Sequence, residues 1–536
     1  MQFADIILKS NAIFTGTGEE VFRGGVAIIG NRIVAVKKDD EIDSLKGDKT
    51  KVYQYGDNLI LPGFNDSHFH FAYTAAFEDD SFCIDLSACR SAEQCIDLLK
   101  EFDEKYPNNP WIFGRNWNYT IWDNPILPDR TSLDEIFPNR PVCINSWDCH
   151  ALWINTKAYE VCGIDRNTPQ PDGGLIEKDE NGDPNGIILD IGATTMVLDY
   201  ALLVPDLKSS VKKFLAKIAQ RGITSVGDVD PIAVSNKNVY EIYKELEDEG
   251  ALTTRINFYP ELESSFKNAA LKTKYTSEKL RFAGLKKFVD GVCETHTGYL
   301  VEPYADMPET KGVPLISEEQ LKEEVIRANR EGIDVRVHAI GEGAVRLSLN
   351  VYEASNKENG NAGFRNSIEH IETIQDSDVP RFKELGVVAS MQPQHAVANI
   401  DGYPTLIGEE RVKNAWAMKK ISDSGAVLAL NTDSPVVQPK PIVSIYSAIT
   451  RTTVDGYPNG GFNSKEKLYM MEILKGWTYN GAYLEQREKD LGTLEEGKLA
   501  DVIVLSKNLF EISEKEILDT KVLLTIMDGQ ATYEEK

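Results

Sequence analysis

The chain has 536 residues, of which 42% are hydrophobic and 26% charged, so it is long enough to form several globular domains. Its 84 acidic residues outnumber 58 basic ones, and no run of Lys or Arg indicates a nucleic-acid-binding surface. No stretch of about 18 uncharged apolar residues could span a bilayer. Seven cysteines without a CxxC pair, and a start without a signal peptide pattern, lead us to expect a cytoplasmic protein without a disulfide framework.

Both ends of the chain are predicted to be rich in β-strands. Short apolar runs separated by turn residues predict strands at 4–8, 13–15, 25–29, 32–36 and 51–55. Two more strands are predicted at 499–505 and 522–530. Because the two ends share this pattern, we expect residues 1–60 and 485–536 to form one small β-sandwich domain.

The middle of the chain, residues 61–484, alternates short apolar runs with amphipathic helical stretches. For example, an apolar run at 332–337 precedes a helical run at 344–355. This alternation predicts an α/β fold and, more narrowly, a TIM-like (β/α)8 barrel. Residues 80–210 contain too many tryptophans, prolines and turn residues for repeated βα units, which predicts an insertion in the barrel that forms part of a substrate pocket.

A histidine pair follows the first predicted strand of the barrel. His68 and His70 are two positions apart, so in an extended strand both imidazoles project from the same face and could bind one metal ion. Taken alone the pattern is weak, because buried histidines often serve only as hydrogen-bonding groups in a protein core.

Three further residues follow predicted strands. His338 and His370 each end a β-rich run about one βα unit apart, and Asp433 ends a later buried run. In a barrel the carboxyl ends of the strands meet on one face, where the catalytic site lies. Four of the seven histidines would then lie beside Asp433. This favours a shared site over the alternative that each histidine is an isolated core or loop residue.

Lys286 occupies a strand-like run at 284–291. A buried lysine needs a partner or loses its charge. A neutral amine can add carbon dioxide and become a carbamate, whose two oxygens can bridge a pair of divalent ions. The alternative is that Lys286 lies at the surface of the sheet.

Several motifs, in this order, resemble those of the amidohydrolase superfamily, and more narrowly its YtcJ-like branch, to which N-substituted formamide deformylase belongs. The motifs are Leu61-Pro62-Gly63 leading into His68-Phe69-His70, His338-Ala339-Ile340-Gly341, Ile368-Glu369-His370, Thr432-Asp433-Ser434-Pro435, and the segment at 491–501. The resemblance covers nearly the whole chain, since segments at 111–117, 148–155 and 222–228 also fit that branch.

The resemblance implies a centre of two divalent ions, expected to be Zn²⁺. His68 and His70 would bind the first ion, His338 and His370 the second, and carbamylated Lys286 would bridge them. Asp433 would bind metal and transfer protons. His150, in the predicted insertion, would contact the substrate or the transition-state oxygen; hydrogen bonding within its own loop is the alternative.

Three residues are predicted to contact the substrate, each with a structural alternative. His296 follows Asp290-Gly291, where relatives commonly carry an arginine, and is expected to line the pocket. Trp117 belongs to the aromatic-rich insertion and would contact an apolar group, or it simply packs the insertion. Arg451 would pair with a substrate anion, or it forms a salt bridge. For His395, pocket lining and a structural role are both open.

The predicted activity is hydrolysis, by metal-activated water, of a carbon–nitrogen bond other than a peptide bond, in an N-formyl or N-acyl compound. The alternatives are a mononuclear metal deaminase, which needs no Lys286, and a non-catalytic regulatory protein on the same fold. The expected partner is a small-molecule substrate, without nucleic acid or membrane, and the sequence is compatible with a homo-oligomer.

Overall fold

The computed structural model describes residues 3–18, 20–147, 149, 151–171, 174–229, 238–360, 363–398 and 400–536. The chain divides into two compact units. The first comprises Met1–Phe69, Leu215–Asp230 and Gly250–Lys536, and the second His70–Phe214 and Pro231–Glu249. Both units combine helices and strands, which confirms the predicted α/β class.

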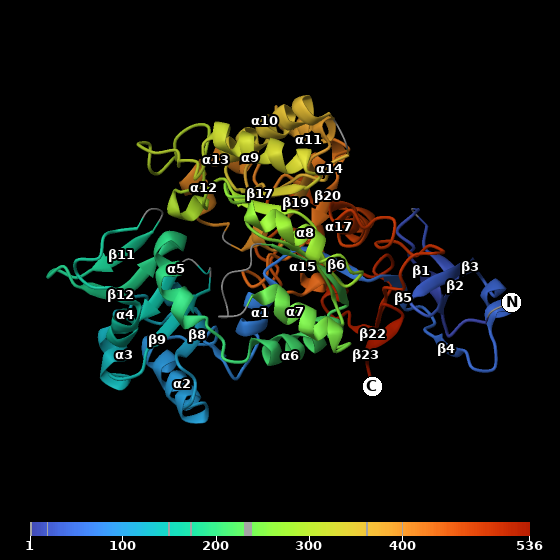
Figure 1. Ribbon diagram of the computed structural model, residues 1–536, viewed down its shortest axis with the longest axis horizontal. Helices are drawn as coiled ribbons and strands as arrows, with labels where there is room; N and C mark the ends of the chain where they lie inside the picture. The colour runs from blue at the N-terminus through green and yellow to red at the C-terminus, as the bar shows by residue number, and fades with distance from the viewer. Residues whose placement is uncertain are drawn as a thin grey trace. The chain divides into compact units, whose positions relative to one another are not determined.

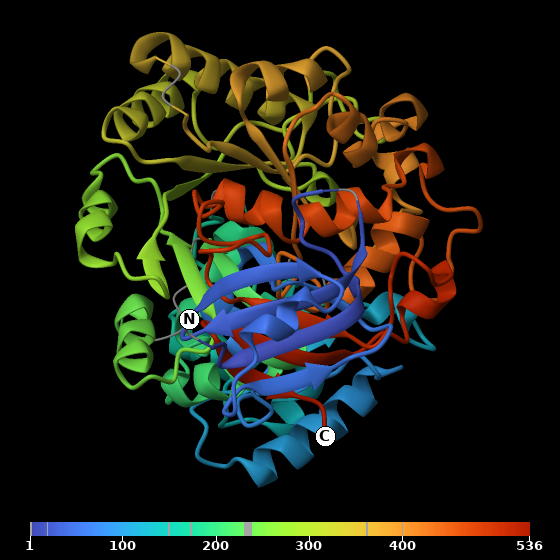
Figure 2. The ribbon, with the colours of Figure 1, turned by 90° about the vertical axis from the view of Figure 1, so that its right-hand side faces the viewer.

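Both ends of the chain contribute to one sheet of the first unit, in the order β23-β22-β21-β5-β1-β2-β3, with β4 beside β1. Figure 2 shows the blue strands of the chain start beside the red strands of the chain end. β5 and β21 join the two sets in antiparallel register. The strands are β1 (Ile6–Ile13), β2 (Phe22–Ile29), β3 (Arg32–Lys38), β4 (Lys51–Gln54), β5 (Leu59–Pro62), β21 (Val502–Leu505), β22 (Val522–Met527) and β23 (Gln530–Glu534).

Parallel strands form two more sheets of the first unit, β15-β14-β13-β6 and β16-β17-β18-β19-β20. Two isolated parallel bridges link them, Glu261 with Lys286 and Phe69 with Ser434. The strands are β6 (Phe64–Phe69), β13 (Ile223–Val229), β14 (Arg255–Tyr259), β15 (Leu280–Phe282), β16 (Leu285–Phe288), β17 (Val335–Ala339), β18 (Ser367–His370), β19 (Val388–Met391) and β20 (Leu428–Leu430).

Helices follow the strands of this unit (Figure 1). α9 and α10 contact β17, and α14 contacts β20. α9 begins where the hydroxyl of Ser317 accepts a hydrogen bond from the Gln320 amide, and it carries acidic residues in its first turn and basic ones in its last. The helices are α8 (Leu271–Lys274), α9 (Glu318–Arg330), α10 (Glu342–Asn359), α11 (Val379–Leu385), α12 (Tyr403–Ile407), α13 (Glu409–Val412), α14 (Met418–Asp423), α15 (Pro441–Thr450), α16 (Met470–Gly476), α17 (Tyr479–Leu484) and α18 (Glu514–Ile517).

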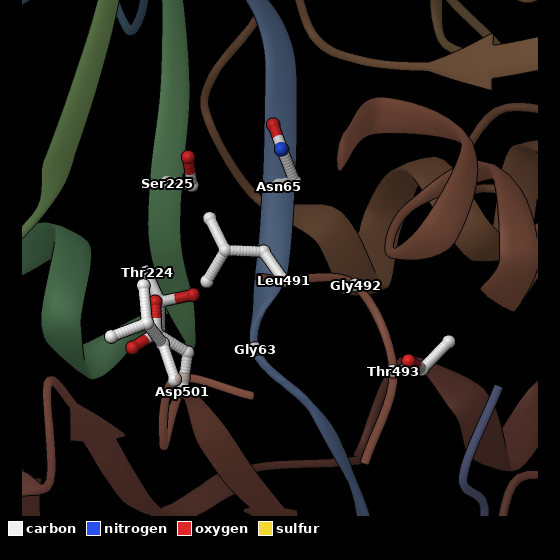
Figure 3. A pocket seen from close by; sticks show the side chains of 9 residues that line it. Gly63, Asn65, Thr224, Ser225, Leu491, Gly492, Thr493 and Asp501 are labelled. Carbon is white, nitrogen blue, oxygen red and sulfur yellow. The ribbon is translucent and has the colours of Figure 1, made fainter. Parts of the chain in front are cut away.

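A small cavity lies where β6 and β13 begin, beside the segment at 491–501 (Figure 3). Gly63 allows the close approach of the two strands, because a Cβ there would lie 2.1 Å from Thr224 Oγ1. The cavity, of about 10 Å³, has room for one water molecule only. It therefore cannot hold an organic substrate.

The second unit contains a six-stranded sheet in the order β11-β12-β10-β9-β8-β7. The strands are β7 (Cys83–Asp85), β8 (Ile112–Trp117), β9 (Val142–Ser146), β10 (Ala151–Ile154), β11 (Leu175–Lys178) and β12 (Pro184–Leu189). The helices are α1 (Phe71–Phe77), α2 (Ala92–Lys105), α3 (Thr131–Ile136), α4 (Thr156–Cys162), α5 (Asp190–Ala201) and α7 (Val239–Asp248), while α6 (Leu207–Gln220) crosses the boundary between the units. In the described part of the chain, no helix is both long and apolar enough to cross a membrane.

Candidate metal centre

His68 is held between two carboxylates. It lies on β6, 1% exposed, and its Nδ1 donates a hydrogen bond of 2.6 Å to Oε2 of Glu369. Its Nε2 lies 3.3 Å from Oδ1 of Asp433. A carboxylate that accepts from one imidazole nitrogen fixes the tautomer and directs the other nitrogen, as around protein-bound metals. Sequence reasoning missed Glu369, although it lies inside the motif that identified His370.

His338 and His370 end the neighbouring strands β17 and β18. The register pairs His338 with Glu369, so these two side chains share one face of the sheet, and strict alternation would turn His370 to the other face. A φ of 76° at His370 ends the alternation. The ring of His370 consequently lies 4.5 Å from that of His338 and 4.9 Å from that of His68, centroid to centroid.

Each of these two histidines has one nitrogen bound to a protein oxygen. His338 Nε2 donates to the carbonyl of Gly291 at 3.2 Å, and His370 Nδ1 donates to Oε1 of Gln392 at 3.1 Å. Gln392 is itself held by Asn431, which accepts from its amide at 2.7 Å. These bonds select the tautomers and leave the opposite nitrogen of each ring with a lone pair for a metal ion.

Asp433 follows β20 and is positioned by β6. Its backbone amide donates to the carbonyl of His68 at 3.0 Å, and its φ is 57°. The preceding residue, Thr432, donates from its amide and its hydroxyl to the buried carboxyl of Asp66, at 2.9 and 2.7 Å. Burial raises the pKa of Asp66 to about 8, and these hydrogen bonds oppose that rise. Asp66, which sequence reasoning also missed, thus ties the loop of Asp433 to β6.

Lys286 is 1% exposed on β16, with Nζ 5.1 Å from the centroid of the Phe288 ring. The register pairs Phe288 with His338, one strand away. The charge of Lys286 contributes to lowering the pKa of all three histidines. Lys286 thus lies on the strand next to that of His338, and its charge acts on all three histidines.

The imidazoles are held in their neutral form. Burial, with the charge of Lys286, lowers the pKa of His68 to about 4. Burial also moves the pKa values of His338 and His370 well below the usual value for histidine. Because a metal ion binds deprotonated nitrogen, neutral imidazoles beside a carboxylate form a suitable donor set.

Two groups of three side chains at Asp433 could each hold a metal ion: His68 with His70, and His370 with His395. Within each group the ligand atoms lie within 4.8 Å of one another. His70 directly precedes α1, and its carbonyl accepts from the Thr74 amide at 2.8 Å. The chemistry of these donors fits a divalent metal.

The residues predicted to bind substrate have contacts of their own. His296 Nε2 lies 3.1 Å from both carboxylate oxygens of Asp306. Arg451 is 1% exposed, and its guanidinium donates to the carbonyls of Phe462 and Trp416 at 2.9 and 3.3 Å. In the second unit, Trp117 donates to the Ile144 carbonyl at 3.0 Å and belongs to the hydrophobic core. His150 lies outside the described residues.

The contacts of Arg451 and Trp117 are those expected for structural roles. The Arg451 bonds to two carbonyls tie together separate loops rather than form the salt bridge considered above, and Trp117 packs against Trp122 and Trp153. A substrate-binding role for these residues, and for His296, stays a prediction.

Comparison with known proteins places the chain in a family. The model of the amidohydrolase family matches residues 56–533. The chain is 28% identical to the YtcJ protein of Bacillus subtilis, over 89% of each chain. It is 25% identical to N-substituted formamide deformylase of Arthrobacter pascens, over 99% of each chain. It is also 25% identical to the exoenzymes regulatory protein AepA of Pectobacterium carotovorum, over 80% of this chain and 93% of the relative.

Two solved structures are similar along most of their length. An uncharacterized metal-dependent hydrolase from Pyrococcus horikoshii has a TM-score of 0.78 and 26% identity, covering 95% of this chain and 99% of that one. One from Pyrococcus furiosus has a TM-score of 0.75 and 27% identity, covering 94% and 99%. Membership of this family and these neighbours support a metal-dependent hydrolase with a TIM-barrel-like fold. The chain belongs to the amidohydrolase family.

Proposed function

We propose that the protein hydrolyses a carbon–nitrogen bond other than a peptide bond, in an N-formyl or N-acyl derivative of a small molecule. The main support for the proposal is one observation. His68, His338, His370 and Asp433 lie at or just after the ends of separate strands, and their side chains are close together. The similarity to N-substituted formamide deformylase over 99% of each chain supports this bond type.

We infer that β6, β13, β14 and β16 to β20 form the (β/α)8 barrel around this centre. The two isolated bridges support this arrangement, because one joins the segment after β14 to β16 and the other joins β6 to the segment after β20. The sheet built from both chain ends would then be part of the predicted β-sandwich domain.

The proposed centre contains two Zn²⁺ ions. His68, His70, His338, His370 and Asp433 would supply ligands, and Lys286, as its carbamate, would bridge the ions. When bound, the ions would activate water and polarise the substrate carbonyl. Two features of the described residues support this set, namely the closeness of the imidazole rings of His68, His338 and His370 and the buried position of Lys286 on the strand next to that of His338.

Side chains of the protein would transfer the proton during the reaction. Asp433 would accept a proton from the attacking water and deliver it to the leaving nitrogen. Its contact with His68 Nε2, at 3.3 Å, places its carboxylate beside the donor set. Glu369 would keep the tautomer of His68 constant during turnover, since it holds Nδ1. His150 is proposed to stabilise the developing oxyanion.

Metal analysis of Lys286→Ala tests the bridging role. We expect about two equivalents of zinc per wild-type chain and a fall towards one in the variant. Lys287→Ala is the matched control, because Lys287 donates to the Leu262 carbonyl at 2.8 Å instead. A single ion in the wild type would favour the mononuclear deaminase, whose product is ammonia.

Activity is tested by screening the metal-loaded wild type against N-formyl, N-acyl, carbamoyl and cyclic amides and measuring the amine released. Asp433→Asn should keep most of the metal but lose roughly 100- to 10,000-fold in kcat, the usual contribution of a general acid–base group. Full activity in Asp433→Asn would contradict its proposed role. Bound metal without turnover of any compound would favour the regulatory alternative, which the similarity to AepA keeps open.

A further inference from the structure

His395 is the one histidine of the centre that the proposed ligand set leaves unused. His395 is the first residue of a 3-10 helix (His395–Val397) that begins shortly after β19 ends. Its ring lies parallel to that of His370, with an interplanar angle of 4° and centroids 6.4 Å apart. One ligand atom each from His395, His370 and Asp433 lie within 4.8 Å of one another.

The Nε2 of His395 is a buried atom that lacks a hydrogen-bond partner among the described residues. A buried polar nitrogen without a partner is costly, so such atoms generally serve a ligand, an ion or an ordered water. The backbone of Thr432 lies close to the His395 ring. A hydrogen bond donated by the other ring nitrogen would leave Nε2 with the lone pair that a metal ion binds.

We propose that His395 is a further metal ligand, which joins His370 and Asp433 at one of the two ions. Imidazole nitrogens and a carboxylate oxygen are ligands that zinc commonly takes in proteins. The proposal deepens the proposed function and rests on metal binding by that centre. It also explains why an otherwise unpaired imidazole nitrogen is buried beside Asp433.

The direct test is spectroscopic and uses the full chain loaded with Co²⁺ in place of zinc. His395→Cys should show a thiolate-to-cobalt charge-transfer band in the near ultraviolet that the wild type lacks. Gln394→Cys is the matched control, because the neighbouring side chain only approaches the Gln438 carbonyl, at 3.5 Å. Subtraction of the wild-type spectrum removes any contribution from the seven native cysteines.

Metal affinity supplies a second measurement that does not depend on turnover. In His395→Ala, competition with a chelator should show one ion bound more weakly than in the wild type. The loss should exceed the 10- to 100-fold that removal of a residue supporting a ligand typically causes. Circular dichroism on the same samples verifies that both variants are folded, and His395→Cys serves if the alanine variant is not.

The outcomes separate this proposal from the proposed function. Absence of the charge-transfer band together with unchanged affinity in His395→Ala would overturn the role of His395 and leave the rest of the centre intact. If the wild type binds metal but hydrolyses none of the amides, the proposed function fails while the spectroscopic result still decides the ligand. A wild type that binds no metal would overturn both.

Discussion

At the scale of single residues, the centre depends on side chains that orient the ligands. Glu369 is fully buried and is held by the hydroxyl of Ser367 as well as by His68. Burial alone would raise the pKa of Glu369, but the hydrogen bond with His68 and the charges of Arg336 and Lys286 outweigh it and hold that pKa low. The carboxylate is thus present to polarise His68 at neutral pH.

Replacing Glu369 with glutamine tests this orienting role. The amide oxygen could still accept from His68 Nδ1, but the negative charge would be gone, so we expect zinc affinity to fall about 10- to 100-fold. Chelator competition with the full chain measures the change. Glu353→Gln, which alters a partly exposed carboxylate paired with Lys357 and Arg381, should leave affinity unchanged. Equal affinity in the wild type and Glu369→Gln would show that the hydrogen bond alone matters.

The proposed ligands could be predicted from the sequence more readily than the residues that would orient them. His338, His370 and Asp433 each follow a run of apolar residues, and parallel strands bring such positions to one edge of a sheet. Glu369 was not predicted because the direction of its side chain depends on the register between β17 and β18, which no local sequence pattern encodes. For His395 the sequence left pocket lining and a structural role open, because it follows its strand by several residues and the loop decides the direction of its side chain.

At the scale of elements, the strands predicted at 25–29, 32–36 and 51–55 are confirmed, whereas the two predicted at 4–8 and 13–15 are one continuous strand, β1. The prediction of one strand at 522–530 was wrong, since β22 and β23 form a hairpin that turns at Asp528-Gly529. The Asp-Gly pair is a strong turn signal that the apolar run concealed. The break in side-chain alternation at His370 was not predictable, because a positive φ is uncommon for residues other than glycine and asparagine.

Asp79 ties two elements of the second unit together. This residue follows α1, and its carboxylate accepts hydrogen bonds from the hydroxyls of Ser210 on α6 and Ser81, both at 2.6 Å. Lys213 on α6 lies 3.1 Å away. Burial alone would raise the pKa of Asp79, but these partners outweigh it and hold the pKa below its ordinary value. Its contribution to stability is therefore complete above the ordinary pKa and disappears as the pH falls through the lowered one.

Asp79→Asn should accordingly destabilise the protein in a pH-dependent way. We expect a loss of roughly 1–3 kcal/mol in the free energy of unfolding at neutral pH, typical of hydrogen bonds to a charged group. The difference from the wild type should shrink below about pH 4, where the aspartate of the wild type becomes protonated. Urea unfolding between pH 7 and pH 3.5 measures it. A difference that stays constant over this range would contradict the role of the charge.

At the scale of the whole chain, strands from both chain ends pair in one sheet of the first unit. Val502 and Val504 on β21 pair with β5, and β22 covers the other edge of β21. Leu524 and Ile526 on β22 are fully buried in a cluster that also contains Leu8. Residues more than 500 positions apart thus share one hydrophobic core, which makes the last strands a condition for the stability of the first.

Deleting residues 506–536 should therefore destabilise the protein well beyond the deleted segment. Burial of a large aliphatic side chain contributes about 1.5–3 kcal/mol, so losing Leu524, Ile526 and Met527 removes on the order of 5 kcal/mol or more. With an unfolding entropy of about 2 cal/mol/K per residue, a chain of this length loses roughly 1 °C of Tm per kcal/mol, so Tm should fall by about 5 °C or more. The uncovered edge of β21 should also promote aggregation, because its backbone groups would be unpaired.

Thermal unfolding by circular dichroism and the yield of soluble protein measure both effects, with deletion of residues 535–536 as the control. Co-expression of the separate 506–536 segment should restore part of the soluble yield, and a truncated chain with the wild-type Tm would show that the two ends fold independently.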